Sequence, residues 1–295
     1  MDTFWQIIAN GIMLGALYAI VSVGLTLIFG IIKVINFAHG EFLMIGMYLT
    51  YVLTNAVGIH PYATIVLVVP ILFCLGALTQ KLLIQPLMSA QDDHIQILAT
   101  VGLSTALINL ALLVFGADVA STPPHGLRTS VELGPVRVLI GQLLIFVLSI
   151  VVVLALQLFL SRSQTGRAVR AVAQNRAAAQ IMGINVNWIF VLTFGVGSAC
   201  VGVAAVAVAP LYPSSPSIGT YFALTCFVVV VLGGLGSIGG AFVGAMIIGL
   251  IDSFAGFYLG SDLREIAVFG VFLLLLIVKP TGLFSARLNL SHVSQ

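Results

Sequence analysis

The chain has 295 residues, of which 60% are hydrophobic and 7% are charged, and its formal net charge at pH 7 is +2. Soluble globular domains contain about 25% charged residues, so this composition excludes a water-soluble protein and indicates one whose main solvent is lipid. The small net charge gives no reason to expect nucleic acid as a partner. The three cysteines stand far apart in apolar runs without metal-ligand spacing, so no metal site is predicted.

Long apolar segments predict an all-α polytopic membrane protein with about eight to ten transmembrane helices and a best count of about nine. The runs are too long and too uniformly apolar for the alternating strands of a membrane β-barrel. The first run lacks the positive charge that opens a secretory signal peptide, so we expect it to be retained as a span. The predicted spans are residues 5–32, 37–57, 62–84, 95–115, 138–160, 188–211, 221–235, 241–257 and 263–278.

The distribution of lysine and arginine predicts the orientation of these spans. If the loop after the first span is cytoplasmic and the spans alternate, only Arg128, Arg137 and Arg264 lie outside. This asymmetry follows the positive-inside rule, so we expect the N-terminus outside and the C-terminus in the cytoplasm. The residues predicted inside are Lys33, Lys81, Arg162, Arg167, Arg170, Arg176, Lys279 and Arg287.

The sequence Asn36 to Phe42, NFAHGEF, is the most unusual polar cluster in an apolar surrounding. One interpretation is local: Asn36 caps the second span, and Glu41 near the start of that helix favours its dipole. Lys33 places this cluster near the inner interface. The alternative is that Asn36, His39 and Glu41 line or gate a translocation pathway, because a charge at membrane depth usually faces a cavity or a partner.

Two loops are predicted on the outer face. Residues 116–137 form an extracytoplasmic loop that combines turn formers with mixed charges, which indicates a folded cap or hairpin in water. Residues 210–219 form a second loop that contains three prolines. Either loop is a candidate surface for a partner, or it simply joins two helices.

A long basic stretch, SRSQTGRAVRAVAQNRAAAQIMGIN, covers residues 161–185 and contains four arginines and no acid. Thr165 as a cap and Gly183 as a stop predict a helix of roughly 17 residues. Two faces are expected on it: Arg167, Arg170 and Gln174 on one, and Val169, Val172 and Ala173 on another. Spacing alone therefore predicts an amphipathic helix on the cytoplasmic side, and leaves open a charged loop that only sets topology.

Five glycines surround Ser237 in a later stretch. Such density favours a break in the helix or a close helix crossing. A discontinuous helix at this point would present backbone groups to a zwitterionic ligand, which makes the stretch a second candidate for the pathway. The candidate residues are Gly233, Gly234, Gly236 and Ser237.

Four sequence blocks resemble, in the same order, those of branched-chain amino acid ABC transporter permeases of the LIV type. They are GLTLIFGIIKVINFAHGEFLMIGMY at 24–48, GRAVRAVAQNRAAAQIMGIN at 166–185, VLGGLGSIGGAFVGAMIIGL at 231–250 and KPTGLF at 279–284. The resemblance covers nearly the whole chain and is close to the high-affinity branched-chain amino acid permease subunit. Permeases for urea and amides are near relatives. It implies one transmembrane permease domain over residues 1–295 in the bacterial plasma (inner) membrane.

The resemblance also implies that residues 161–187 form a cytoplasmic coupling loop. In ABC importers such a loop carries a motif E-A-A-x-x-x-G, whose short helix sits in a cleft of the ATPase subunit. Ala178, Ala179 and Gly183 match the last part of this motif, whereas Ala177 stands where the acid would be. The remaining coupling residues expected are Arg167, Arg170, Asn175 and Arg176, whose arginines would pair with acids on the ATPase.

The chain contains no phosphate-binding motif G-x-x-x-x-G-K-[ST] and no Gly-Lys dipeptide. We therefore expect a transport subunit without enzymatic activity, catalytic residues or a bound cofactor, with ATP and Mg²⁺ on its partners. The resemblance implies two ATP-binding subunits, a second homologous permease subunit and an extracytoplasmic substrate-binding protein. The expected cargo is a small amino acid, in first place leucine, isoleucine or valine, or a related amide or urea.

Two other classes of protein remain as alternatives. An ion-coupled secondary transporter of small zwitterions would keep acids at the membrane midplane. Its candidates here are Glu41, Asp252 and Glu265, and each lies toward the end of a predicted span. An intramembrane enzyme built on His39 and Glu41 would need further catalytic residues converging on them, and the sequence has no HExxH pattern.

Overall fold

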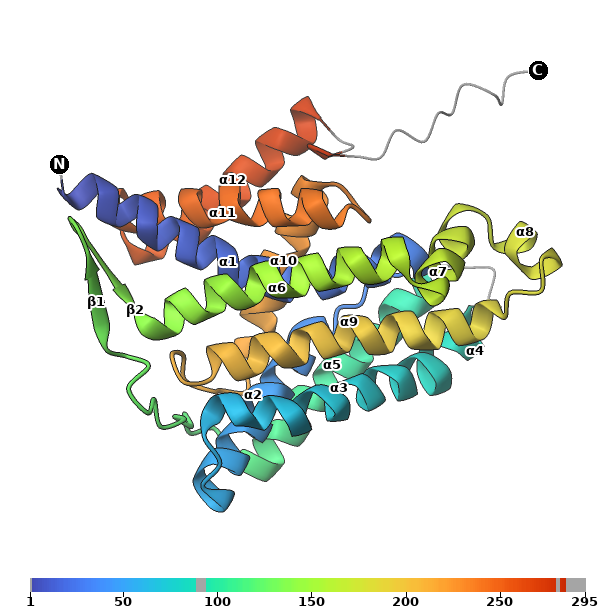
Figure 1. Ribbon diagram of the computed structural model, residues 1–295, viewed down its shortest axis with the longest axis horizontal. Coiled ribbons are helices and arrows are strands. Elements are labelled where there is room, and N and C mark those ends of the chain that lie inside the picture. Colours follow the sequence, from blue (N-terminus) through green and yellow to red (C-terminus); the bar gives the residue numbers. More distant parts are fainter. Residues whose placement is uncertain (1, 89–93, 280–281, 285–295) are drawn as a thin grey trace.

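The computed structural model describes residues 2–88, 94–279 and 282–284 (Figure 1). These residues are predominantly helical, as the sequence predicts, and a short antiparallel hairpin joins them. The helices are α1 (Asp2–Ile32), α2 (His39–Val57), η1 (Pro61–Thr64), α3 (Ile65–Thr79), η2 (Gln80–Ile84), α4 (Gln85–Leu87), α5 (His94–Phe115), α6 (Ile140–Arg162), α7 (Gln164–Gln174), α8 (Arg176–Ile181), α9 (Val186–Val208), α10 (Ile218–Gly233), α11 (Ile238–Tyr258) and α12 (Ser261–Val278). The strands are β1 (Ser130–Leu133) and β2 (Val136–Leu139).

Every predicted span coincides with helical structure. Among the described residues, six helical segments are long and apolar enough to cross a membrane: Thr3–Ile32, Pro61–Leu87, His94–Phe115, Ile140–Arg162, Val186–Val208 and Ile238–Tyr258. The shorter apolar helix α10 and helices α2 and α12 occupy the positions of the remaining predicted spans. The polytopic helical fold is thus confirmed, while the count of about nine spans and the orientation of the termini stay predictions.

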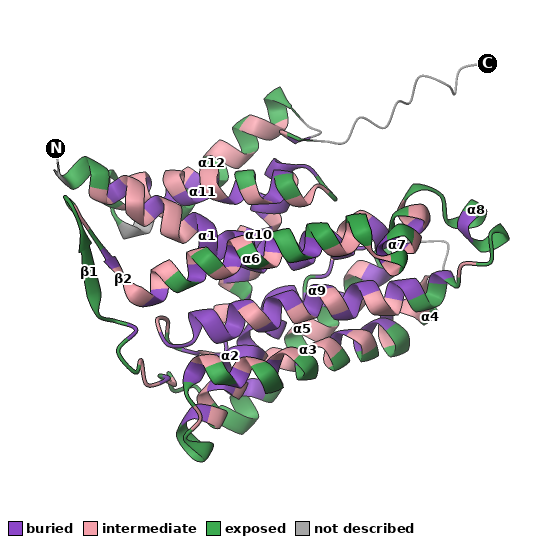
Figure 2. Ribbon diagram, in the orientation of Figure 1, coloured by how far each residue is buried: buried purple, intermediate pink, exposed green. Residues whose placement is uncertain are grey.

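Helices α1 and α9 form the centre of the bundle (Figure 2). In the most apolar 18-residue stretch of each helix, 78% of the residues of α1 and 72% of those of α9 are buried. The corresponding shares are 17% for α5 and 22% for α6. The peripheral helices α5 and α6 are apolar on their exposed sides as well, which fits lipid contact. The two central helices are therefore the scaffold that positions the buried polar groups.

Glycines allow α1 to pack closely against α11. A Cβ on Gly11 would lie 2.9 Å from Cα of Leu250, and one on Gly15 would lie 2.8 Å from Cα of Met246. Such contacts require glycine, and spacing of small residues by four is typical of tight crossings in membranes. The close approach places the first half of α1 beside the middle of α11.

Helix α2 begins near the middle of α1 rather than at its end. Nε2 of His39 lies 3.1 Å from the carbonyl oxygen of Val21. Val21 precedes the last residue of α1, Ile32, by about three helical turns, which is roughly 16 Å along the axis. The link over residues 33–38 therefore returns into the bundle. The first turn of α2 therefore lies beside Val21 of α1 and not beside Lys33 at the end of that helix.

The hairpin and the α7–α8 segment lie at opposite ends of the bundle (Figure 1). At the hairpin end, the amide of Gln6 donates a 2.8 Å hydrogen bond to the carbonyl of Arg137 and accepts one of the same length from its N–H. At the other end, Nη2 of Arg176 donates to the carbonyl of Ile32. The hairpin turns at Gly134, at φ +65°, so a hairpin predicted within residues 116–137 is present, while the location of this loop on the outer face stays a prediction.

Candidate functional site

The basic loop folds into two short helices instead of one. Ser163, not Thr165, caps α7, and its Oγ accepts a 2.8 Å hydrogen bond from the N–H of Gly166. The helix ends at Asn175, which is extended at φ −153° and caps α8 through a 3.0 Å bond from the N–H of Ala178. An asparagine side chain that accepts a hydrogen bond from a backbone N–H later in the chain competes with continuation of the helix. The prediction of a single helix of roughly 17 residues is therefore wrong, and the segment forms the two short helices α7 and α8.

Helix α7 is amphipathic, as predicted. Val169 and Val172 are 2% and 1% exposed and belong to the main core. Arg167 and Arg170 are exposed on the other side. The helix is thereby fixed to the transmembrane bundle by its apolar face and turns its arginines toward solvent.

The end of α8 presents apolar side chains to water. Gly183 lies at φ +82°, and the N–H groups of Gly183 and Ile184 donate to the carbonyls of Gln180 and Ala179 at 2.9 and 3.0 Å. This is a Schellman ending, which confirms Gly183 as the stop. The two residues before Gly183 are large, apolar and exposed: Ile181 is 88% exposed and Met182 is 82% exposed. Exposed apolar tips of this kind indicate a docking surface.

Arg176 connects the loop to the bundle. Its Nη2 donates a 2.5 Å hydrogen bond to the carbonyl of Ile32 at the end of α1. Its guanidinium also lies over the ring of Phe190 on α9, 5.0 Å from the ring centroid. A positive charge at a helix C-terminus stabilises that helix. Arg176 thus holds α8 against α1 and α9, while its predicted contact with a partner stays a prediction.

The glycine-rich stretch forms the turn between α10 and α11. Gly234 and Gly236 have φ values of +101° and +86°, and Ser237 caps α11 by accepting a 3.1 Å bond from the N–H of Gly240. The predicted break is therefore confirmed. The turn packs beside Gly30 near the end of α1, since a Cβ on Gly30 would lie 2.8 Å from Cα of Gly236.

This turn is separate from the NFAHGEF cluster, because the first faces Gly30 and the second faces Val21 on α1. The N–H of Leu283 also donates a 2.8 Å hydrogen bond to the carbonyl of Leu232 at the end of α10. Some backbone carbonyls at the turn therefore already accept hydrogen bonds from the chain itself and are not free to bind a ligand. The structure does not bring the two predicted groups of pathway residues together.

The polar side chains of the NFAHGEF cluster are buried, whereas Phe37 is exposed. Asn36, His39 and Glu41 are each at most 2% exposed. Oδ1 of Asn36 accepts a 3.1 Å hydrogen bond from the N–H of Ala38, so Asn36 stabilises the turn that leads into α2. It does not cap that helix as predicted, because Ala38 occupies the N-cap position. His39 is bonded to α1 by its ring. Among the described residues, Nδ2 of Asn36 and Nδ1 of His39 are nevertheless buried without a hydrogen-bond partner, as is one oxygen of Glu41, and Glu41 is the acidic member of the cluster.

Glu41 faces the start of α10. Thr220 donates a long hydrogen bond of 3.5 Å to its Oε1. Oε2 is buried without a well-formed hydrogen bond among the described residues, although Ser104 of α5 lies near the carboxylate. A carboxylate at this depth with so few partners is costly, and in membranes such a group usually marks a pathway.

The backbone crossing beside Glu41 requires two glycines. Gly40 of α2 and Gly219 of α10 touch directly, and a Cβ on Gly219 would lie 2.8 Å from the carbonyl oxygen of Gly40. We expect Gly40→Ala to destabilise the protein by about 1–3 kcal/mol, because its methyl group would overlap the backbone of α10. Thermal unfolding in detergent measures this change.

Gly102→Ala is the matched control, since a Cβ there meets no atom within 4 Å. It should leave stability unchanged or raise it by up to about 1 kcal/mol, the difference in helix propensity. Equal melting temperatures for the two variants would contradict the close crossing at Gly40.

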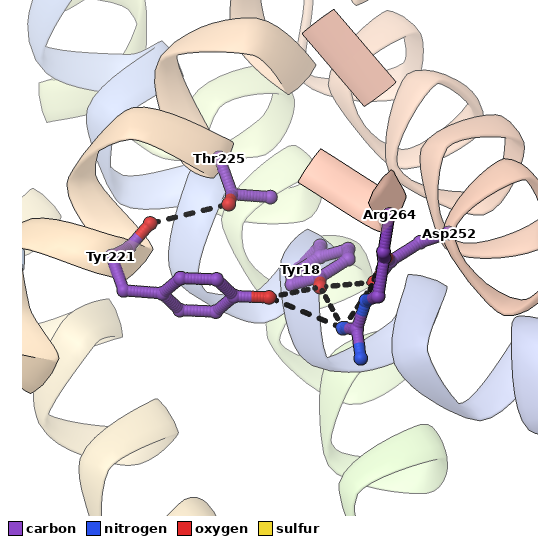
Figure 3. Close-up of polar contacts among 5 residues, drawn as sticks. All are labelled: Tyr18, Tyr221, Thr225, Asp252 and Arg264. Atoms are coloured by element: carbon purple, nitrogen blue, oxygen red, sulfur yellow. Dashed lines mark hydrogen bonds and ion pairs between the residues drawn. The ribbon is translucent and has the colours of Figure 1, made fainter. Parts of the chain in front are cut away.

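A charged network joins four helices in the bundle (Figure 3). Asp252 of α11 is 3% exposed and is paired with Arg264 of α12, whose Nε and Nη2 both donate to its carboxylate. Tyr18 of α1 donates a 2.6 Å hydrogen bond to Oδ2 of Asp252. Nη2 of Arg264 also lies 3.2 Å from the hydroxyl of Tyr221 on α10. Arg264 does lie near the start of α12, as the predicted span end requires, whereas Asp252 is buried among the helices and paired with it rather than reaching the surface.

A cavity of about 300 Å³ adjoins this network. Tyr18, Tyr221 and Asp252 line one part of it, and Thr220, which also bonds Glu41, lines another. The sequence reasoning missed this site. The sequence does contain charged residues in otherwise apolar segments, namely Asp252, Arg264 and Glu265. Their positions in the sequence do not show that Asp252 and Arg264 form an ion pair.

Comparison with known proteins identifies relatives over almost the full length. Residues 7–278 match the family model described as branched-chain amino acid transport system / permease component. The chain is 31% identical over 293 residues to the high-affinity branched-chain amino acid transport system permease protein BraD of Pseudomonas aeruginosa, with 95% of each chain covered. It is 32% identical over 294 residues to the corresponding permease protein LivH of Salmonella typhimurium, again with 95% of each covered.

A more distant organism supplies a similar match. The chain is 30% identical over 293 residues to the probable branched-chain amino acid transport permease protein LivH of Methanocaldococcus jannaschii, covering 95% of this chain and 90% of that one. No solved structure matches the chain significantly.

Proposed function

We propose, since the chain belongs to the branched-chain amino acid transport permease family, that it moves a small amino acid into the cell as the membrane subunit of an ATP-driven ABC importer. The observation that carries this proposal is the similarity over 95% of the chain to permeases named for branched-chain amino acids. Leucine, isoleucine or valine is the proposed cargo, with related amides or urea next. The protein is a multi-pass protein of the plasma membrane, and residues 1–295 act as one permease domain.

The proposed contact with the ATPase is the α7–α8 segment within residues 161–187. Helix α7 is anchored by its buried valines, and α8 is held to α1 by Arg176. Such an anchored segment transmits a push from a partner to α1 and α9 at the centre of the bundle. In this proposal Asn175, Ala178, Ala179 and Gly183 shape α8, while Arg167 and Arg170 offer charge to acids on the partner.

The energy source is proposed to lie on partner subunits. Two ATP-binding subunits would hold ATP and Mg²⁺, and a second, homologous permease chain would complete the pathway. A substrate-binding protein would deliver the amino acid from outside, where the loop over 116–137 is proposed to lie. The absence of a phosphate-binding loop from the sequence supports this division of labour.

Expression with the neighbouring genes and gentle purification tests the proposed function. Co-purification of ATPase chains and a second permease, with ATP-dependent uptake of labelled leucine in proteoliposomes, is the expected result. A stable homo-oligomer without any ATPase would contradict it.

The buried Glu41 carboxylate favours a second candidate, an ion-coupled carrier of small zwitterions. Its depth and sparse hydrogen bonding are the properties that such a carrier uses to bind and release a proton or cation. ATP depletion and an ionophore separate the candidates: the importer loses uptake under the first treatment, and the carrier loses it under the second.

Glu41→Gln tests the role of Glu41 in the pathway. The amide keeps the shape of the side chain but removes a charge buried with few partners, so we expect unchanged or higher thermal stability. Uptake should fall by about tenfold, corresponding to about 1.4 kcal/mol in the barrier. Glu132→Gln, on the exposed hairpin, is the control and should transport normally. An unchanged uptake rate for Glu41→Gln would leave Glu41 as a helix-end residue.

A further inference from the structure

The cavity beside Asp252 combines charged, hydroxyl and apolar side chains. Tyr18, Ser217, Thr220, Tyr221 and Thr225 contribute hydroxyl groups, and Asp252 and Glu265 contribute carboxylates. Leu224, Val268 and Phe269 form its apolar part. Pockets for small ligands are mostly apolar with a few convergent polar groups, and at about 300 Å³ this one fits a small solute.

Among the described residues, the charges in this region are not all neutralised. Asp252 is fully engaged by Arg264 and Tyr18. Arg264 uses Nε and Nη2 for its bonds to Asp252 and the two tyrosines, and Nη1 carries none of these bonds (Figure 3). Glu265, the next residue on α12, lines the cavity and forms no ion pair with the described residues. One donor and one acceptor of opposite charge therefore remain for a ligand.

We propose that this cavity is a binding station for a zwitterionic amino acid with an apolar side chain. Nη1 of Arg264 and the hydroxyl of Tyr221 would receive the carboxylate, and Glu265 would receive the ammonium group. The side chain would contact Leu224, Val268 and Phe269. This inference rests on the proposed import function and deepens it, because it assigns to the permease a recognition step of its own.

The position of the cavity fits such a station. Tyr18 lies near the middle of α1, and Thr220 joins the cavity wall to Glu41 on α2. The lining residues come from α1, α10, α11 and α12, so a ligand there contacts helices that meet the cytoplasmic segment through α1. Occupation of the station thus has a direct physical connection to the segment proposed to receive the ATPase.

A cysteine-protection experiment on the whole transport complex in proteoliposomes tests the station. Leu224→Cys, about half exposed in the cavity wall, is alkylated with a thiol reagent in a Cys74→Ser background, because Cys74 is the exposed native cysteine. We expect leucine to slow this reaction. Leucine methyl ester, which lacks the carboxylate, and 4-methylpentanoate, which lacks the ammonium group, should not slow it.

Two further variants complete the experiment. Glu265→Gln should raise the half-protecting leucine concentration by about tenfold, as expected for loss of one charge-assisted bond. Phe257→Cys, exposed on α11 outside the cavity, should react at the same rate with and without leucine.

The outcomes separate this inference from the proposed function. ATP-driven leucine uptake with no protection at Leu224→Cys, or equal protection by leucine and both decoys, overturns the station and leaves the importer intact. Ser217→Cys provides a second labelling position at the cavity. Failure of both cysteines to react also overturns the proposal, because the cavity would then be closed to solutes. Absence of ATP-driven uptake by the unmodified complex rejects the proposed function itself.

Discussion

Replacing both Ile181 and Met182 with aspartate is expected to abolish uptake while the permease still inserts and folds. These side chains are 88% and 82% exposed, so their substitution removes no contact inside the chain. Burial of one large apolar side chain contributes about 1.5–3 kcal/mol, so the loss of two from a docked interface weakens binding by at least about a hundredfold. Co-purification of the ATPase, measured together with leucine uptake, reports this loss.

The conservative pair Ile181→Leu and Met182→Leu is the matched control and should retain both activities. If the double aspartate variant still bound the ATPase and transported normally, α8 would not be the docking surface. A third variant, Gly183→Val, tests whether docking depends on the backbone conformation at the end of α8 in addition to the apolar side chains. Its β-branched side chain is strained at φ +82° by about 1–2 kcal/mol, so it should disturb the end of α8 without changing the apolar surface.

The loop shows what sequence patterns can and cannot predict. The period of Val169, Val172, Arg167 and Arg170 is a property of one helix, and the structure confirms the two faces. The choice between Ser163 and Thr165 as the cap depends on where α6 ends, and the break at Asn175 depends on its own side chain bonding ahead. The free energies of the competing caps and helix ends differ by about 1 kcal/mol, and the spacing of residues in the sequence does not reveal so small a difference.

The depth of α2 was not predictable, because it depends on the path of the chain in three dimensions. Lys33 after a long apolar run indicates an interface, and the structure agrees that α1 ends there. The following link then turns back, so that His39 meets Val21. The return also depends on the close contact of Gly40 with Gly219, and a single sequence contains no sign that two such distant glycines touch.

The burial of Glu41 and Asp252 bears on the choice between an ATP-driven importer and an ion-coupled carrier. At span ends both acids would be ordinary interfacial residues. The structure instead buries both, but it pairs Asp252 with Arg264 and leaves Glu41 with weak partners. A paired acid is poorly suited to carry a coupling proton, so Glu41 is the residue on which the ion-coupled alternative depends.

Arg264→Met is expected to be the most destabilising single change in the membrane bundle. It leaves the carboxylate of Asp252, 3% exposed, without its cation, and removal of one partner from a buried pair costs about 3–5 kcal/mol. The lower end of this range applies, because about a third of the Arg264 side chain is exposed. The apparent melting temperature in detergent should therefore fall by roughly ten degrees.

The double variant Asp252→Leu with Arg264→Met should recover most of this loss, since a buried pair replaced by apolar groups is often neutral in stability. Recovery of stability without recovery of leucine uptake would assign the charges of this network to transport. Recovery of both would assign them to folding alone and would contradict the proposed binding of the ligand carboxylate by Nη1 of Arg264. A single Arg264→Met variant that melts at the wild-type temperature would mean that Asp252 finds another partner, and the network in Figure 3 would not hold the four helices together.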